Sequence, residues 1–263
     1  MDLSVVVPTL NGRDRLRACL DALAEHVPNA EVVVVNGPST DGTTGMLRER
    51  DDLSALVEVS ERNLNVARNA GIAESTGDVV ALVGHDVTVE ETWHDGVATA
   101  MADGATVVTG PVHRAVRAGM TTESVETRTI AGRDVTYFAG ENVAFERETL
   151  ESVDGFDENL YTGGARDCAH RLAGQDRHVT WSPSVCVESG DDGEGVERDW
   201  GEKYRALAYR MVKNYGPRLT VFRRTGRDAL ADARAVARQV IDGDAEPSLW
   251  MESGKQVAEN AAL

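Results

Sequence analysis

The chain has 263 residues, a length that suits one α/β domain with a sizeable core and a smaller helical extension. Its formal net charge is −17, and the acidic residues are spread along the sequence instead of forming one tail. This spread argues against a disordered acidic tail. The same charge repels phosphates, so nonspecific binding to nucleic acid is disfavoured and we expect no nucleic-acid partner.

The cysteines and the apolar runs indicate the compartment. There are three cysteines and no C-x-x-C pair, with Cys19 in a helix pattern and Cys186 in a strand pattern. This arrangement favours core packing over a disulfide or zinc framework and is consistent with a reducing interior. The sequence begins without a signal peptide, and no apolar run approaches the ~20 residues of a membrane span. We expect a soluble, cytoplasmic protein.

The first third of the chain alternates Val-rich runs with segments of helical periodicity. Strands are predicted at the runs that start at Val5, Val32 and Val79. Continuous apolar runs of this kind are typical of strands buried on both faces of a parallel sheet. The intervening helices are predicted at Arg13–Glu25, after the Ser39–Asp41 turn, and at Asn65–Glu74.

The middle of the chain continues this alternation with less regular spacing. A polar stretch, Arg114–Arg133, separates two predicted strands and is either mobile or a short hairpin. The further predicted elements are a helix at Glu90–Met101, strands at Thr106–His113 and Thr136–Phe145, a helix at Arg166–Ala173 and a strand at His178–Val187.

The composition changes after Ser189. An acidic, Gly-rich loop spans residues 191–195, and apolar residues then recur at helical spacing from Tyr204 to Tyr215. A second helix is predicted at Arg227–Ile241. We therefore divide the chain into a domain of residues 1–195 and a C-terminal helical extension of residues 196–263.

Polar residues gather where the predicted strands end. The carboxyl ends of parallel strands form the edge at which an open α/β sheet binds its ligand, so these side chains are candidates for holding a nucleotide. They are Pro8, Thr9, Asn11, Asn36, Ser39, Asp41, Arg68, Asn69, His85 and Asp86.

Several segments, in order and at the right spacing, resemble motifs of the family 2 glycosyltransferases. They are SVVVPTLNG (residues 4–12), VVVVNGPSTDGT (32–43), ARNAG (67–71), VVALVGHD (79–86), the GENVAFER…GFDE region (140–158) and GGARDCAHRL (163–172). The resemblance implies a GT-A fold, with a Rossmann-like, mostly parallel central sheet flanked by helices and a C-terminal helical tail. It also implies transfer of a sugar from a nucleotide-diphosphate sugar, with inversion.

The resemblance assigns roles at the strand ends. Asp86 matches the metal-binding second Asp of the family's D-x-D motif, implying a divalent cation, Mn²⁺ or Mg²⁺, with phosphate oxygens in its shell. His85 could add a nitrogen ligand. The alternative is that Asp86 caps a turn and His85 packs outward. Asn36, Arg68 and Asn69 fall where the family contacts the nucleotide.

The general base is sought at the start of the predicted helix Arg166–Ala173. Asp167 is the matching carboxylate and the candidate catalytic residue, although it could instead pair with Arg171 four residues on. Other candidates are Glu141, Glu188, Asp191 and Asp192. An acceptor that is already ionised, such as a lipid phosphate, needs no base.

The acceptor implied by the resemblance is a lipid-linked or cell-surface glycan. The acidic, lysine-poor composition resembles that of proteins from high-salt cytoplasm, which suggests a salt-loving archaeon and N-glycosylation of a surface-layer glycoprotein. The helix Lys203–Tyr215 could contact the cytoplasmic face of a membrane carrying a polyprenyl-phosphate-linked acceptor. The alternative is a catalytically degenerate GT-A domain that binds a nucleotide sugar or a partner, because Gly84, Gly164 and Ala165 replace family carboxylates.

Overall fold

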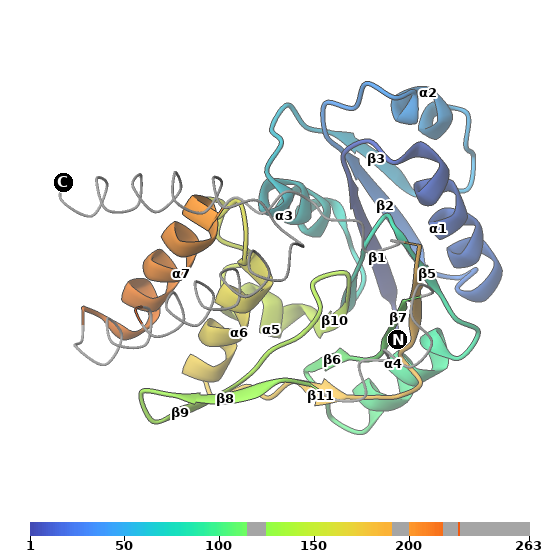
Figure 1. Ribbon diagram of the computed structural model, residues 1–263. Coiled ribbons are helices and arrows are strands. Elements are labelled where there is room, and N and C mark those ends of the chain that lie inside the picture. The colour runs from blue at the N-terminus through green and yellow to red at the C-terminus, as the bar shows by residue number, and fades with distance from the viewer. Residues whose placement is uncertain (115–124, 191–199, 218–225, 227–263) are drawn as a thin grey trace, which may run out of the picture. The chain divides into compact units, whose positions relative to one another are not determined.

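The computed structural model describes residues 1–114, 125–190, 200–217 and 226, and the chain divides into two compact units. The first unit comprises residues 1–159 and 164–194, and the second comprises residues 160–163 and 195–263. The first carries a seven-stranded sheet in the order β11-β6-β10-β4-β1-β2-β3 (Figure 1). The second contains helix α7, Trp200–Tyr215, which confirms the helix predicted over Tyr204–Tyr215.

The central strands of the sheet are parallel, as the Val-rich runs predict. β1 pairs in parallel with both β4 and β2, and β2 pairs in parallel with β3. β10 is antiparallel to β4 and β6, while β11 is parallel to β6. The strands are β1 Leu3–Thr9, β2 Glu31–Asn36, β3 Ala55–Glu58, β4 Val79–Val83, β6 Val107–Thr109, β10 Asn142–Glu146 and β11 Thr180–Trp181.

Helices cover both faces of this sheet. The side chains of each strand alternate between the two faces, and both faces of the central strands carry buried apolar side chains. Val5 and Val7 belong to the core formed with Leu16 and Leu20 of α1. Val6 points to the opposite face, where α3 packs so closely that a Cβ on Gly71 would lie 2.3 Å from Val6 Cγ1. Figure 1 shows α1 and α3 on opposite sides of the sheet. The helices of this unit are α1 Arg13–His26, α2 Thr43–Arg48, α3 Leu64–Glu74, α4 Trp93–Ala102, α5 Arg147–Ser152 and α6 Gly164–Gly174.

Two smaller sheets complete the first unit. β5 (Val87–Val89), β12 (Val187–Ser189) and β7 (Val112–Arg114) form one, in the order β5-β12-β7. β8 (Thr127–Ile130) and β9 (Arg133–Thr136) form a hairpin, and its turn places Ala131 and Gly132 at positive φ. The hairpin begins within the stretch Arg114–Arg133, for which the sequence predicts either a mobile segment or a short hairpin. Residues 115–124 of that stretch are outside the described residues, as are the predicted loop 191–195 and helix 227–241.

Three segments that were each predicted to form one strand contribute to two strands instead, so these three predictions are wrong. Thr106–His113 divides into β6 and β7 in different sheets, because Pro111 lacks an N–H to donate and a Cβ on Gly110 would meet Val185 O at 2.0 Å. Thr136–Phe145 divides into the end of β9 and β10, and His178–Val187 divides into β11 and the start of β12 around Pro183. The helix predicted to start at Glu90 begins at Trp93 instead, after the unpredicted strand β5.

The helices that the structure describes include none with the length and apolarity to cross a bilayer.

Candidate active site

The loops that follow β1 and β2 are joined by hydrogen bonds. The Asn11 backbone N–H donates to Ser39 Oγ at 2.8 Å, and the Thr40 N–H donates to Asn11 Oδ1 at 2.9 Å. The Thr9 hydroxyl closes the first loop by donating to the Asn11 carbonyl at 3.0 Å. Residues predicted to bind the nucleotide therefore lie together at the carboxyl ends of two adjacent parallel strands, where α/β sheets bind ligands.

Asp41 links the same loops to the first turn of α1. Its Oδ2 accepts the backbone N–H groups of Gly12 at 2.8 Å and Arg13 at 3.1 Å, while Oδ1 accepts the Thr43 hydroxyl at 2.6 Å. The Thr43 hydroxyl, followed by these backbone donors, holds the pKa of the Asp41 carboxyl well below its usual range. Asp41 is exposed, so this is a solvent-facing anchor between the β1 and β2 loops.

Asn36 is buried at the end of β2, and its amide is engaged within the protein. Its Nδ2 donates to Thr44 Oγ1 at 2.9 Å, and its Oδ1 accepts the Ser39 hydroxyl at 2.7 Å. Asn36 therefore orients Ser39, which in turn accepts the N–H of Asn11. This geometry gives Asn36 a positioning role and places Ser39 and Asn11 closer to the surface.

His85 lies against the start of α1, so the alternative that it packs outward is wrong. Gly12 has φ 84°, and a Cβ there would lie 2.8 Å from the imidazole Nε2. Only glycine accommodates this approach without displacing the ring. Burial lowers the pKa of His85 below its ordinary value, against the opposing Asp86 carboxylate, and Arg15 lowers it further. The imidazole therefore packs beneath the β1 loop.

Asp86 and Glu141 meet at Gly84. The Gly84 N–H donates to the Glu141 carbonyl at 3.0 Å, across the antiparallel β10–β4 pair. A Cβ on Gly84 would lie 2.8 Å from Glu141 Cβ and 2.9 Å from Asp86 Oδ1. The glycine that replaces the family's first Asp thus leaves room for the side chain of Glu141. The sequence indicates Glu141 only as a candidate base, because the register of β10 against β4 is not visible in it.

Arg68 is buried beside Glu141. Its guanidinium donates to the Gly140 carbonyl at 3.0 Å and to Asn65 Oδ1 at 3.1 Å, and its Cζ lies 5.0 Å from the centre of the Phe156 ring. Burial lowers the pKa of Arg68 to about 10, while Glu141 opposes this shift. Among the described residues, the buried Nε of Arg68 has no hydrogen-bond partner. A positive charge is therefore held next to Glu141.

Asn69 faces a different segment of the chain. Its Nδ2 donates to the Phe156 carbonyl and to the Glu158 carboxylate, both at 2.8 Å, and its Oδ1 accepts the Phe156 N–H at 2.9 Å. Asn63 holds the same segment through the Glu158 carbonyl at 2.6 Å. These contacts bind α3 to the GFDE segment, residues 155–158. Asn69 is thus a positioning residue whose described contacts do not include the nucleotide loops.

Asp167 forms an ion pair with Arg171, which the sequence allows as the alternative to a role as general base. Its side chain is 0% exposed, and its Oδ2 accepts the Arg171 Nε–H at 2.8 Å. Arg171 also donates to the Val153 carbonyl. A fully buried carboxylate with this partner does not reach an acceptor hydroxyl, so the geometry argues against Asp167 as the base. Glu188 is exposed on β12, whereas Asp191 and Asp192 fall outside the described residues.

Solved glycosyltransferase structures have the same architecture. A mannosyltransferase from Pyrobaculum calidifontis, solved with GDP-Man and Mn²⁺, matches with a TM-score of 0.64 at 22% identity, over 99% of this chain and 79% of that one. The structure of S. aureus TarS in complex with UDP-GlcNAc matches with a TM-score of 0.63 at 19% identity, over 82% of this chain and 68% of that one. The protein therefore has the GT-A fold.

Sequence comparison identifies the family. Residues 4–153 match the family model described as glycosyl transferase family 2. The chain is 29% identical over 221 residues to glycosyltransferase AglE of Haloferax volcanii, which covers 75% of this chain and 70% of that protein. It is 23% identical over 218 residues to a pre-mycofactocin glycosyltransferase of Mycobacterium tuberculosis, covering 76% of this chain but only 44% of that relative. The chain belongs to glycosyl transferase family 2 and is a glycosyltransferase.

Proposed function

We propose that this glycosyltransferase moves a sugar, with inversion, from a nucleotide-diphosphate sugar to a lipid-linked or cell-surface glycan. The observation that carries the proposal is the convergence of Asp86 and Glu141 at Gly84, beside the joined loops of β1 and β2. Carboxylates at this edge suit the diphosphate end of the donor once a cation is present, and the loops suit its nucleoside end. The solved relatives bound to GDP-Man and UDP-GlcNAc support this class of donor.

Asp86 and Glu141 would hold the divalent cation. Carboxylate oxygens are the ligands that Mg²⁺ prefers, and Mn²⁺ accepts the same set, so the donor atoms of this site fit either ion. When bound, the cation neutralises charge that develops on the leaving diphosphate. Arg68 contributes a fixed positive charge next to Glu141. The Mn²⁺ in the mannosyltransferase structure supports a manganese site.

The nucleotide loops bind the donor through residues that the Asp41 network holds in place. Asn11 and Ser39 present polar groups at the surface of this network, while Asn36 fixes Ser39 from below. Thr9 and Pro8 end β1 behind them, with Pro8 also in contact with His85. Asn69 then supports the acceptor side by fixing the GFDE segment.

The acceptor is a glycan carried by a polyprenyl phosphate, and the protein acts in N-glycosylation of a surface-layer glycoprotein in a high-salt archaeal cytoplasm. The similarity to AglE of Haloferax volcanii and the net charge of −17 support this assignment. Tyr209 and Val212 of α7 are exposed next to Lys213, a combination that suits peripheral contact with a membrane.

The test is a transfer assay in molar KCl. The protein is incubated with Mn²⁺, with UDP-GlcNAc or GDP-mannose, and with polyprenyl-phosphate or short glycan-lipid acceptors, and the release of UDP or GDP is measured. We expect acceptor-dependent release that Asp86→Asn abolishes and that the control Asp95→Asn, an exposed residue of α4, does not change. Donor binding without transfer to any acceptor would favour a binding module instead.

A further inference from the structure

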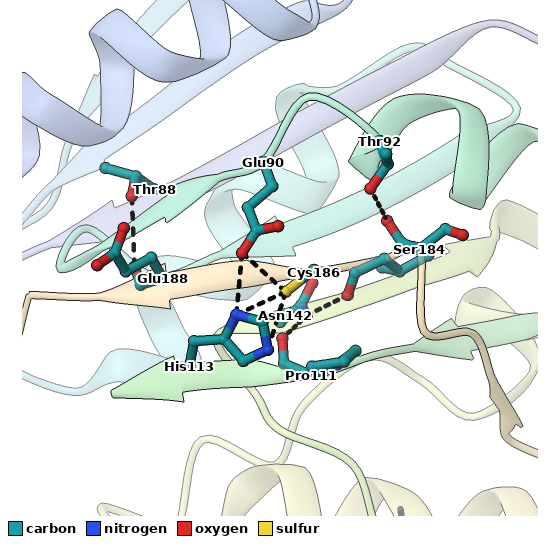
Figure 2. A network of polar contacts seen from close by, with 10 residues as sticks. Thr88, Glu90, Thr92, Pro111, His113, Asn142, Ser184, Cys186 and Glu188 are labelled. Atoms are coloured by element: carbon teal, nitrogen blue, oxygen red, sulfur yellow. Dashed lines mark hydrogen bonds and ion pairs between the residues drawn. The ribbon is translucent and has the colours of Figure 1, made fainter. Parts of the chain in front are cut away.

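Three side chains with metal-binding atoms meet on the small sheet formed by β5, β12 and β7. Glu90 directly follows β5, His113 belongs to β7, and Cys186 directly precedes β12. Figure 2 shows the three side chains pointing toward one another from three separate segments of the chain. The sequence separations are large, at 23 residues from Glu90 to His113 and 73 from His113 to Cys186, so no spacing motif announces the group.

The ligand atoms lie close enough to share one ion. Glu90 Oε1 lies 3.0 Å from His113 Nδ1 and 3.0 Å from Cys186 Sγ, and Cys186 Sγ lies 3.2 Å from His113 Nδ1. Tetrahedral zinc with bonds of roughly 2.0–2.3 Å separates its ligand atoms by about 3.3–3.8 Å. The three atoms would therefore need to move apart by only a few tenths of an ångström. We propose that Glu90, His113 and Cys186 form a zinc site.

The chemistry of this set selects zinc over the cation expected at Asp86. Thiolate and imidazole are ligands of Zn²⁺, whereas Mg²⁺ and Mn²⁺, the cations expected at Asp86, are suited by oxygen ligands. Three protein ligands leave the fourth tetrahedral position for water or another exchangeable ligand. This position faces solvent, because Cys186 is 3% exposed while the side chains of His113 and Glu90 are 41% and 43% exposed.

The backbone around the three ligands is fixed before any ion binds. The Glu90 N–H donates to the Cys186 carbonyl at 3.1 Å, which joins two of the ligand-bearing residues directly. Behind them, buried Asn142 donates to the carbonyls of Pro111 at 3.2 Å and Val185 at 2.8 Å, one residue before β7 and Cys186 respectively (Figure 2). A prearranged framework of this kind lowers the ordering cost of binding a metal.

The zinc site is separate from the donor site. β12 pairs antiparallel with β5, so that Gly190 donates to the Asp86 carbonyl at one end of the pair while Cys186 meets Glu90 at the other. The three-residue strand β5 keeps the two ends roughly 10 Å apart. Zinc here fastens β5, β7 and β12 together and so stabilises the strand that begins next to Asp86. The inference does not depend on the proposed donor or acceptor.

Cobalt substitution tests the site. The full chain is stripped of metal with a chelator and titrated with Co²⁺, then with Zn²⁺ by calorimetry. We expect one Co²⁺ to give a thiolate-to-cobalt charge-transfer band and intense tetrahedral d–d bands, and Zn²⁺ to displace it. Cys186→Ser should abolish the charge-transfer band and lower Zn²⁺ affinity by about 100-fold or more, since losing even an outer-shell partner costs roughly 10- to 100-fold. His113→Gln should lower the affinity similarly and, being half-exposed, serves if Cys186→Ser fails to fold.

Three controls make the result specific. His94→Gln changes a histidine that pairs with Asp95 on α4 at 3.3 Å, and it should leave both titrations unchanged. Cys19→Ala removes a buried thiol elsewhere, and Asp86→Asn removes the expected manganese ligand, and neither should affect the charge-transfer band. The proposal is overturned if the wild-type protein shows no thiolate-to-cobalt band, or if the band persists in Cys186→Ser.

Discussion

Glu141 lies directly beside Gly84, and its carbonyl accepts the Gly84 N–H at 3.0 Å where the family's metal motif normally supplies its first Asp. The side chain of Glu141 therefore occupies space that an Asp at position 84 would need. We therefore expect Glu141, just before β10, to supply the carboxylate that position 84 lacks after β4, so that two carboxylates serve the proposed donor site.

Restoring the usual Asp should harm the site. A Cβ at position 84 would lie 2.8 Å from Glu141 Cβ, so Gly84→Asp is expected to cost about 1–3 kcal/mol of stability through overpacking and to weaken Mn²⁺-dependent donor binding about tenfold. The double variant Gly84→Asp with Glu141→Gly should recover both. Pairing Gly84→Asp with Glu141→Ala should not, because alanine keeps the clashing Cβ. Thermal unfolding and calorimetry measure these effects, and a harmless Gly84→Asp would refute this role of Glu141.

Asp167 is expected to matter for stability and not for chemistry. Asp167→Asn leaves the Arg171 guanidinium, 16% exposed, without its charged partner, and breaking a buried pair in this way costs about 3–5 kcal/mol. The double variant Asp167→Asn with Arg171→Met should recover much of that loss, since it removes both charges. Denaturant unfolding gives the free energies. A variant of unchanged stability that binds donor but transfers no sugar would restore Asp167 as the base.

The Asp41 network should give a recognisable pH dependence. The pKa of Asp41 is lowered in the folded protein, so its stabilisation is complete above the unfolded pKa of about 3.9 and is lost as the pH falls through the lower folded value. Asp41→Asn should therefore lower the Tm by a constant amount between about pH 7 and pH 5, and the difference should narrow below about pH 4. Scanning calorimetry at molar KCl measures it. If Asp41→Asn has the same Tm as the wild type at pH 7, the role of this carboxylate is contradicted. The control is Asp14→Asn, which changes an exposed carboxylate of α1.

Two helical glycines should respond in opposite ways to the same substitution. Gly71→Ala places a Cβ 2.3 Å from Val6 Cγ1 and 2.9 Å from Val35 Cγ2, so α3 must move from the sheet at a cost of about 1–3 kcal/mol. Gly45 in α2 has nothing within 4 Å of an added Cβ, and Gly45→Ala should stabilise the protein by about 0.5–1 kcal/mol. Chemical denaturation distinguishes the two. Equal effects at both positions would argue against the close packing of α3.

The sequence predicts the parts of the fold that local patterns determine. The Val-rich runs predicted the parallel strands β1, β2 and β4, and the periodicity of Leu16, Leu20 and Leu23 predicted α1 to within one residue at its C-terminal end. Short strands next to proline were joined wrongly, because a run of apolar residues does not reveal that Gly110 and Pro111 redirect the chain into a second sheet.

The pairing between segments that lie far apart in the chain could not be predicted from the sequence. The antiparallel register of β10 on β4 brings Glu141 to Gly84, and the β5-β12-β7 order brings Cys186 to Glu90. Neither juxtaposition follows from spacing along the chain. The roles of Asn36 and Asn69 were likewise hidden, because an asparagine in a motif reveals nothing about which partners occupy its amide.

The most direct test of the central claim is calorimetric titration of UDP-GlcNAc and GDP-mannose in molar KCl, with and without Mn²⁺, into the wild type, Asp86→Asn, Glu141→Gln and Asp95→Asn. If Asp86 and Glu141 share the cation, the wild type will bind donor only in the presence of Mn²⁺. Asp86→Asn and Glu141→Gln will each lose most of this Mn²⁺-dependent affinity for the donor. Asp95→Asn will match the wild type. If Glu141→Gln binds donor and Mn²⁺ as the wild type does, Glu141 is not a ligand and the two-carboxylate site is wrong.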